Sequence, residues 1–270
     1  MPNGVLYGTL SVANQLRKTD LGGIAQGGTL SAAVELGNGP TDHFYVSGDV
    51  AGTLTVPYVD TDFQVTGGVI ETGSITVYQS FDTTGFPAAA LGGIAGGGSV
   101  HIGSLAGELH CTGPMLGTLE VVEDQTGALV LDDTATGTLM IGGDVEPGAN
   151  IQIANYASLY NLAMPNGVLY GALSVGDVLR KADLAGIAAD AKLNVAVQIG
   201  NGPTDHFYVN DDVAGALTVP YVDTAFQVAG AVTSTGVITI YQSLDTAGYA
   251  EAGFYSVASG GTVQIGTLAW

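Results

Sequence analysis

The chain has 270 residues, 42 of them glycine, and its 25 acidic residues outnumber its 5 basic residues to give a formal net charge of −20. The glycines follow no three-residue period, which excludes a collagen helix, and so few cations exclude a nucleic-acid partner, because phosphate contacts need lysine or arginine. Charged residues are 11% of the chain and apolar residues 46%, so neither a coiled coil nor a disordered chain is expected. The sequence contains no run of 18 apolar residues, so no membrane span is expected.

A long internal repeat organises the chain. The opening residues MPNGVLYG recur from Met164, and the two copies align without gaps from Met1 with Met164 to Ala106 with Ala269. About two-thirds of the aligned pairs are identical. We therefore expect three parts: copy A at 1–107, a linking part of the same solenoid at 108–163 and copy B at 164–270. The repeat favours a segment of a longer tandem array, and the alternative is a two-copy protein that starts at Met1.

A five-residue motif, Gly-x-Leu/Ile/Val-x-Val/Ile, recurs within the long repeat. Its successive starts are about 20–25 residues apart, and one longer step leads from Gly137 to Gly171. The alternation of apolar and polar residues predicts a short strand with one buried face, and the glycine marks a tight corner. The apolar motif positions, among them Leu10, Leu54 and Ile75, are expected in the core, and Cys111 falls at such a position.

These strands predict an all-β fold, a parallel β-solenoid with coils of about 20–25 residues. The alternative is a pair of β-sandwiches, since strands at intervals of about 8–12 residues are typical of sandwiches as well. Few hairpin dipeptides and a strand pattern of constant phase favour the solenoid.

The segments GDVAGTLTV at 48–56 and GSLAGEL at 103–109 resemble the coils of parallel β-helix proteins. They are similar to repetitive bacterial surface fibres and adhesins and, more distantly, to bactofilins, which polymerise end to end. The resemblance implies a location outside the cell or at the cell surface.

The histidines are weak candidates for chemistry. The ten-residue block GNGPTDHFYV occurs at 37–46 and again at 200–209, and it contains His43 and His206, each preceded by an aspartate. An Asp-His pair suits acid–base or metal chemistry, but no nucleophile stands at a recognisable spacing, so an ordered loop is expected. His101 and His110 are predicted on outward positions of neighbouring strands and are not expected to bind metal.

Paired acidic residues are weak candidates for Ca²⁺, which takes six to eight oxygen ligands. The pairs are Asp60 with Asp62, Asp132 with Asp133, Asp211 with Asp212, and Glu123 with Asp124. None belongs to an EF-hand pattern, so a solvated acidic surface is the alternative. The tyrosines that recur in both copies, such as Tyr58 and Tyr78, are expected to pack at corners, the alternative being contact with a carbohydrate.

Four of the five cations occur as Arg17-Lys18 and Arg180-Lys181, one repeat apart on an acidic chain. They are candidates for contacts with acidic residues of a neighbouring copy. Strand edges are normally protected by lysine or proline, and lysine is nearly absent here. We therefore expect a non-enzymatic structural protein, a subunit or segment of an extracellular filament or adhesin stalk that assembles by end-to-end stacking, without a cofactor. The alternative is a carbohydrate-binding or polysaccharide-active β-helix.

Overall fold

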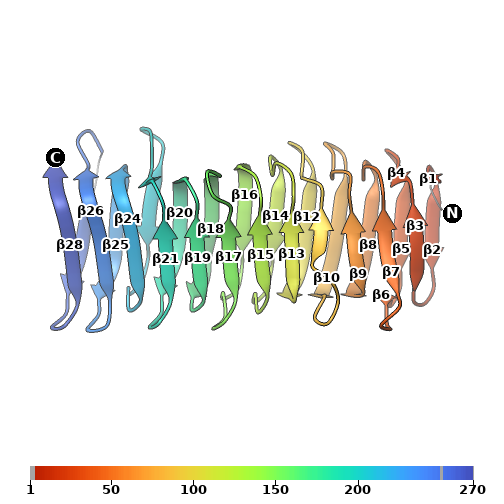
Figure 1. Cartoon of the computed structure of the whole chain (residues 1–270), viewed down its shortest axis with the longest axis horizontal. Coiled ribbons are helices and arrows are strands. Elements are labelled where there is room, and N and C mark those ends of the chain that lie inside the picture. The colour runs from red at the N-terminus through yellow and green to blue at the C-terminus, as the bar shows by residue number, and fades with distance from the viewer. Residues whose placement is uncertain (1–3, 250–251, 270) are drawn as a thin grey trace. The chain divides into compact units, whose positions relative to one another are not determined.

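The computed structural model describes residues 4–249 and 252–269. These residues form 28 strands and no helix. The strands pair in parallel, which confirms the predicted β-solenoid, here of about 12 coils, and the β-sandwich alternative is therefore wrong. The chain divides into two compact units, Met1–Met140 and Ile141–Trp270. Figure 1 shows the strands of each unit stacked side by side in chain order. The predicted parts 1–107, 108–163 and 164–270 remain a description of the sequence repeat.

The strands of the first unit are short and most begin after a glycine or at a corner. They are β1 (Val5–Leu6), β2 (Thr9–Val12), β3 (Lys18–Leu21), β4 (Gly23–Ile24), β5 (Thr29–Ala32), β6 (Glu35–Gly37), β7 (His43–Val46), β8 (Thr53–Asp60), β9 (Asp62–Val65), β10 (Ser74–Asp82), β11 (Ala89–Leu91), β12 (Ser99–Ala106), β13 (Glu108–Cys111), β14 (Thr118–Val121) and β15 (Ala128–Leu131). β16 (Ala135–Ile141) contains the boundary between the units.

The strands of the second unit follow the same plan. They are β17 (Asn150–Ile153), β18 (Leu159–Leu169), β19 (Ala172–Val175), β20 (Val178–Ile187), β21 (Lys192–Val195), β22 (Gln198–Ile199), β23 (His206–Val209), β24 (Ala216–Asp223), β25 (Ala225–Val232), β26 (Val237–Asp245), β27 (Ala252–Val257) and β28 (Thr262–Ala269).

The strand register reproduces the motif spacing. In the first unit Leu54 lies opposite Leu30 on one side and Ile75 on the other, and Ile75 lies opposite Val100. Each motif strand thus stacks on the motif strand of the preceding coil. In the second unit Ile151 lies opposite Leu173. Residues 149–153 therefore form a motif strand inside the long step from Gly137 to Gly171, and the motif search missed it because Ala149 replaces the glycine.

Coil length varies most at one corner, which we call the variable corner: residues 38–42, 61, 83–88 and 107 of the first unit. β10 also has a bulge between Val77 and Ser80. A single residue makes this corner between β8 and β9 and between β12 and β13, whereas longer loops make it before β7 and β11. The paired strands on either side keep their register. The motif strands therefore stay in phase although the coils differ in length.

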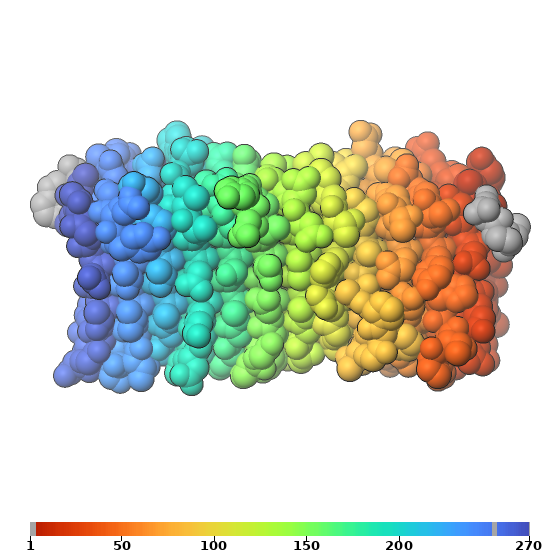
Figure 2. Space-filling view, viewed as in Figure 1, coloured from red at the N-terminus to blue at the C-terminus, as the bar shows by residue number. Residues whose placement is uncertain are grey.

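The core is a set of stacked side-chain ladders. Leu54, Ile75 and Cys111 are fully buried, as predicted. Phe44 stacks on Phe63 in the next coil with ring centroids 5.2 Å apart. In Figure 2, residues of successive coils form successive colour bands across each unit. The expectation for Leu10 is wrong: its side chain is 37% exposed because β2 pairs with β5 on one side and no described strand covers the other.

Candidate functional site

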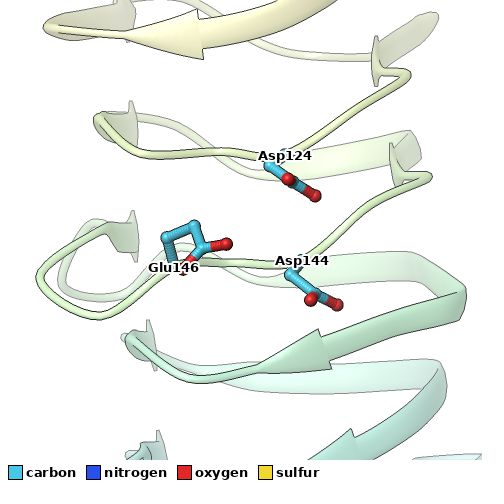
Figure 3. A group of neighbouring side chains, drawn as sticks. All are labelled: Asp124, Asp144 and Glu146. Carbon is cyan, nitrogen blue, oxygen red and sulfur yellow. The ribbon is translucent and has the colours of Figure 1, made fainter.

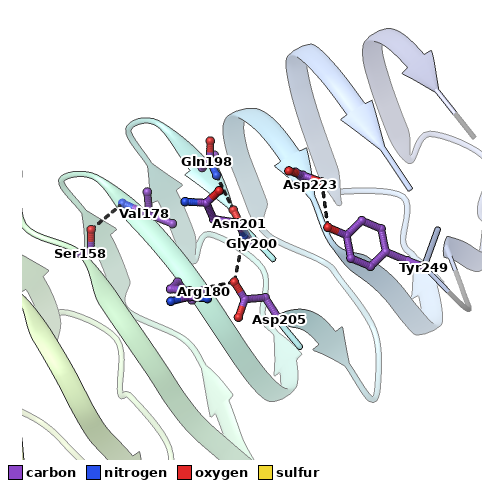
Figure 4. A network of polar contacts seen from close by, with 9 residues as sticks. All are labelled: Ser158, Val178, Arg180, Gln198, Gly200, Asn201, Asp205, Asp223 and Tyr249. Carbon is purple, nitrogen blue, oxygen red and sulfur yellow. Dashed lines mark hydrogen bonds and ion pairs between the residues drawn. The ribbon is translucent and has the colours of Figure 1, made fainter. Parts of the chain in front are cut away.

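An ion pair closes the variable corner at 38–42 in the first unit and its equivalent in the second unit, the second variable corner at 201–205. In the second unit Nε of Arg180 donates to Oδ2 of Asp205 at 2.8 Å, and the backbone N–H of Asn201 donates to the same oxygen at 2.9 Å (Figure 4). In the first unit Nε of Arg17 donates to Oδ2 of Asp42 at 2.7 Å. The side chains of both aspartates are 1% exposed. The block is thus an ordered corner, and its aspartate accepts the arginine of the preceding coil.

The two arginines predicted to contact a neighbouring copy each form an ion pair inside their own chain. Arg180 also lies over the ring of Tyr160, 4.8 Å from its centroid, and the hydrogen bond to Asp205 is the main cause that raises the pKa of Arg180. Among the described residues Lys18 and Lys181 have no carboxylate within ion-pair distance. The assembly role of Arg17, Lys18, Arg180 and Lys181 stays a prediction.

Each of the four histidines contacts one carboxylate. His43 lies 3.4 Å from Asp20 and stacks on Tyr45, and His206 repeats this arrangement 3.1 Å from Asp183. In the first unit His101 lies 2.6 Å from Glu120, and His110 lies 2.6 Å from Glu108. Acid–base chemistry also needs a nucleophile or a second acid in reach. His43 has a second carboxylate, Asp62, as its register partner in the next coil. The contacts of the four histidines are cross-strand or same-strand polar pairs.

Asp60 and Asp62 lie on either side of the variable corner but hold different partners. Asp60 is the register partner of Asp82, and burial, followed by the charges of Asp82 and two further carboxylates, raises its pKa. Asp62 accepts hydrogen bonds from the hydroxyl of Tyr45 and from Gln64. The bond to Asp62 is the main cause that raises the pKa of Tyr45 to about 12. These hydrogen bonds give Asp62 a structural role, whereas Asp60 lies among other carboxylates.

A recurring corner device, which the sequence analysis missed, uses aspartates as acceptors for the next coil. Oδ1 of Asp49 accepts the N–H of Gly68 at 3.0 Å, and Oδ1 of Asp212 accepts the N–H of Ala231 at 2.7 Å. Asp144 accepts the N–H of Val168 at 2.8 Å in the same way. The sequence contains one signal for this device: an aspartate occupies the same position in both copies, since Asp212 is the copy-B equivalent of Asp49.

The calcium candidates lie on loops and corners between strands. Figure 3 shows Asp144 and Glu146 on the loop between β16 and β17 of the second unit, and Asp124 on the loop between β14 and β15 of the first. Asp132, Asp133 and Asp211 are exposed at coil corners, and Asp133 accepts the N–H of Thr134. Each described loop supplies one or two carboxylates against the six to eight oxygens that Ca²⁺ takes. A calcium role for these residues, Asp60, Asp62 and Asp212 included, stays a prediction.

A groove of neutral polar side chains runs along the second unit, with a cavity volume of about 490 Å³. Its row of register partners comprises Gln152, Ser174, Asn194 and Thr218, one from each successive coil. Tyr241, 51% exposed, lies at the same groove. This tyrosine and its equivalent Tyr78 are exposed, so the expectation that the recurring tyrosines pack at corners is wrong for them.

The end coils expose apolar side chains that equivalent coils bury. At the β2 edge Leu10 is 37% exposed, whereas its copy-B equivalent Leu173 is fully buried beneath β17. At the β28 edge Leu268 is 46% exposed, whereas its copy-A equivalent Leu105 is fully buried. β28 pairs with β26 on one side, and no described strand pairs with its other edge. Neither β2 nor β28 contains a charged residue. We call these two surfaces the β2 edge and the β28 edge.

Comparison with known proteins adds no relative: no family model, no curated protein and no solved structure matches the chain. The likeness to surface fibres, adhesins and bactofilins therefore rests on the coil motif alone. The described residues include no helix of the length and apolar character needed to cross a membrane.

Proposed function

We propose that the chain is a structural, non-catalytic subunit that assembles end to end by stacking of its solenoid edges. One observation carries the proposal: residues that are fully buried where a coil covers them are a third to a half exposed at the β2 and β28 edges. Burying one such side chain completely is worth about 1.5–3 kcal/mol, and unpaired strand edges add backbone donors and acceptors that seek partners.

The charge distribution supports contact at the edges rather than the sides. The net charge of −20 repels neighbouring chains, and the repulsion is screened as ionic strength rises. The strands of both edges are uncharged. Stacking is therefore expected to increase with salt, and a filament or stalk outside the cell remains the biological setting that we propose from the coil motif.

The test is sedimentation velocity and electron microscopy of the whole chain over a range of concentration and salt. We expect assemblies whose mass grows with concentration and with salt. Leu268→Glu at the β28 edge should suppress them, whereas the control Val122→Glu, which adds the same charge at an exposed side position, should not. A monomer at every concentration and salt would overturn the proposal, as would equal effects of the two variants.

The polar groove favours a second candidate, binding of a neutral glycan. Amide side chains both donate and accept hydrogen bonds, as sugar hydroxyls do, and an exposed aromatic ring can cover an apolar sugar face. Gln152 and Asn194 are exposed, make no hydrogen bond to another described side chain and point along one row.

A glycan screen followed by calorimetry tests this candidate. Asn194→Ala and Tyr241→Ala should each weaken binding of any neutral glycan that the screen finds. The control is Tyr78→Ala, because Tyr78 occupies the same motif position in the first unit outside this groove. No binding by the native chain, or binding that Tyr78→Ala weakens equally, would contradict the groove assignment.

A further inference from the structure

The β2 edge has a covered counterpart inside the second unit, and this counterpart indicates which kind of strand would cover the edge. β19 is the copy-B equivalent of β2, and β17 covers it in the way that the β2 edge lacks. The residues Ile151 and Ile153 of β17 lie opposite Leu173 and Val175. A strand that covers the β2 edge should therefore resemble β17.

The segment that leads into β28 resembles the segment that leads into β17, and both use a turn that recurs in other coils, for example at Gly97. Residues 257–265 read VASGGTVQI, and residues 145–153 read VEPGANIQI. Both turns place a glycine at positive φ, 91° at Gly148 and 96° at Gly260. Both close with a backbone hydrogen bond of 2.9 Å, from Ala149 to Glu146 and from Gly261 to Ala258. β28 therefore has the local structure that a strand covering a β2-type edge requires, with Val263 and Ile265 at the positions of Ile151 and Ile153.

Resting on the proposed end-to-end assembly, we propose that β28 of one chain pairs in parallel with β2 of a second copy. The register places Val263 opposite Leu10 and Ile265 opposite Val12. Val257, 48% exposed, then covers Leu6, as Val145 covers Leu169 in the second unit. The contact would bury the side chains that each edge exposes. It would also pair the free backbone N–H and C=O groups of β2 with those of β28.

A glycine at the β2 edge carries the sharpest consequence. A Cβ at Gly171, which precedes β19, would clash with the carbonyl oxygen of Ala149 in the coil beneath. A Cβ at the equivalent Gly8 meets nothing within 4 Å. In the proposed contact the carbonyl of Gly261 from the second copy takes the place of the Ala149 carbonyl. Gly8 is then required for assembly although nothing described in its own chain requires it.

The contact involves part of a coil. In the second unit the first half of β18, Leu159–Met164, pairs with β20 next to the contact of β17 with β19. We assign the proposed contact to β28 and to Val257 at the end of β27, while the rest of β27 and β3 do not take part.

The first test compares Gly8→Ala with Gly253→Ala by sedimentation velocity and thermal unfolding. Neither added Cβ meets a described atom of its own chain, so both variants should unfold like the native chain. Gly8→Ala should raise the concentration needed for assembly by about tenfold or more, since overpacking of this kind costs about 1–3 kcal/mol. Gly253→Ala, on β27 outside the contact, should leave assembly unchanged.

The second test traps the register by disulfide formation between two singly substituted chains. Ser11→Cys and Gln264→Cys would face each other about 4.8 Å apart across parallel strands, within the Cα range of a disulfide. Gln152→Cys with Ser174→Cys in one chain is the positive control, because these residues are register partners. Ser11→Cys mixed with Thr262→Cys is the out-of-register control and should link much more slowly.

The outcomes separate this proposal from the one on which it rests. Assembly of the native chain that Gly8→Ala leaves intact, without linkage between the Ser11→Cys and Gln264→Cys chains, would overturn the register and keep end-to-end assembly. Absence of native assembly would overturn both. Loss of assembly in Gly8→Ala, together with in-register linkage, is the expected result.

Discussion

Removal of the guanidinium from the ion pair at the second variable corner is the strongest test of how this corner is held. Asp205 is 1% exposed and accepts both Nε of Arg180 and the N–H of Asn201. Arg180→Met keeps the aliphatic stem but leaves a buried carboxylate without its cation. Breaking a buried pair in this way costs about 3–5 kcal/mol. Because the Arg180 side chain is 31% exposed and water can reach the site, we expect a value of about 3 kcal/mol, the lower end of that range.

The partner substitution should cost less. Asp205→Asn keeps an oxygen that can accept the N–H of Asn201, and the guanidinium that it leaves behind can be hydrated. We expect about 1.5 kcal/mol, the value of one hydrogen bond to a charged group. Arg17→Met in the first unit is the matched comparison. It should cost less than Arg180→Met, because Arg17 is 57% exposed and has no aromatic ring beneath it among the contacts described.

Native-state hydrogen exchange of the segment 200–209 measures these changes locally, which is preferable for a chain whose coils can open separately. The amides of Asn201 and Asp205 are both hydrogen-bonded in the corner and report its opening. A loss below about 1 kcal/mol in Arg180→Met, or a larger loss in Asp205→Asn, would refute the view that the buried carboxylate depends on its arginine.

Three further outcomes follow from the structure. The pKa of Tyr45 is raised to about 12, so the stability due to its protonated hydroxyl is complete below pH 10 and is lost as pH rises toward 12; Tyr45→Phe should flatten the unfolding profile in that window. Burial raises the pKa of Cys111 to about 11, so a thiol reagent at pH 8 should modify it only after unfolding, and fast modification of the native chain would contradict its burial. Gly171→Ala should destabilise the chain by about 1–3 kcal/mol in urea unfolding, whereas Gly8→Ala should not, and equal effects would show that the close approach at Gly171 is unimportant.

The coil architecture was predictable because it depends on short-range pattern. Alternating residues after a glycine define a strand with one buried face, and the spacing of these motifs equals the register of the stacked strands, as for Leu54, Ile75 and Val100. The sequence search missed the motif at 149–153 because Ala149 stands at the corner where the other motifs have a glycine. The exposure of Leu10 was mispredicted for a different reason. Its sequence pattern is that of a core residue, but its burial depends on whether another strand covers it.

The polar contacts were less predictable. An aspartate that accepts an amide from the next coil, such as Asp49, lies 19 residues from its donor, Gly68. No feature of the neighbouring sequence distinguishes such an aspartate from one that is only solvated. The Arg17–Asp42 pair is similarly separated by 25 residues. Such pairs become visible only when coil lengths are known, and the variable corner makes those lengths irregular.

The variable corner also bears on how such a chain can change over evolution. One residue, Gly107, closes it in one coil, while the longer loop 83–88 closes it in the coil before, and Ile75 still faces Val100 in register. Insertions at this corner therefore leave the ladder of buried residues undisturbed, whereas an odd insertion within a motif strand would turn its apolar side chains outward. The corner is a place where new loops, and with them new binding specificities, can be added to an unchanged scaffold.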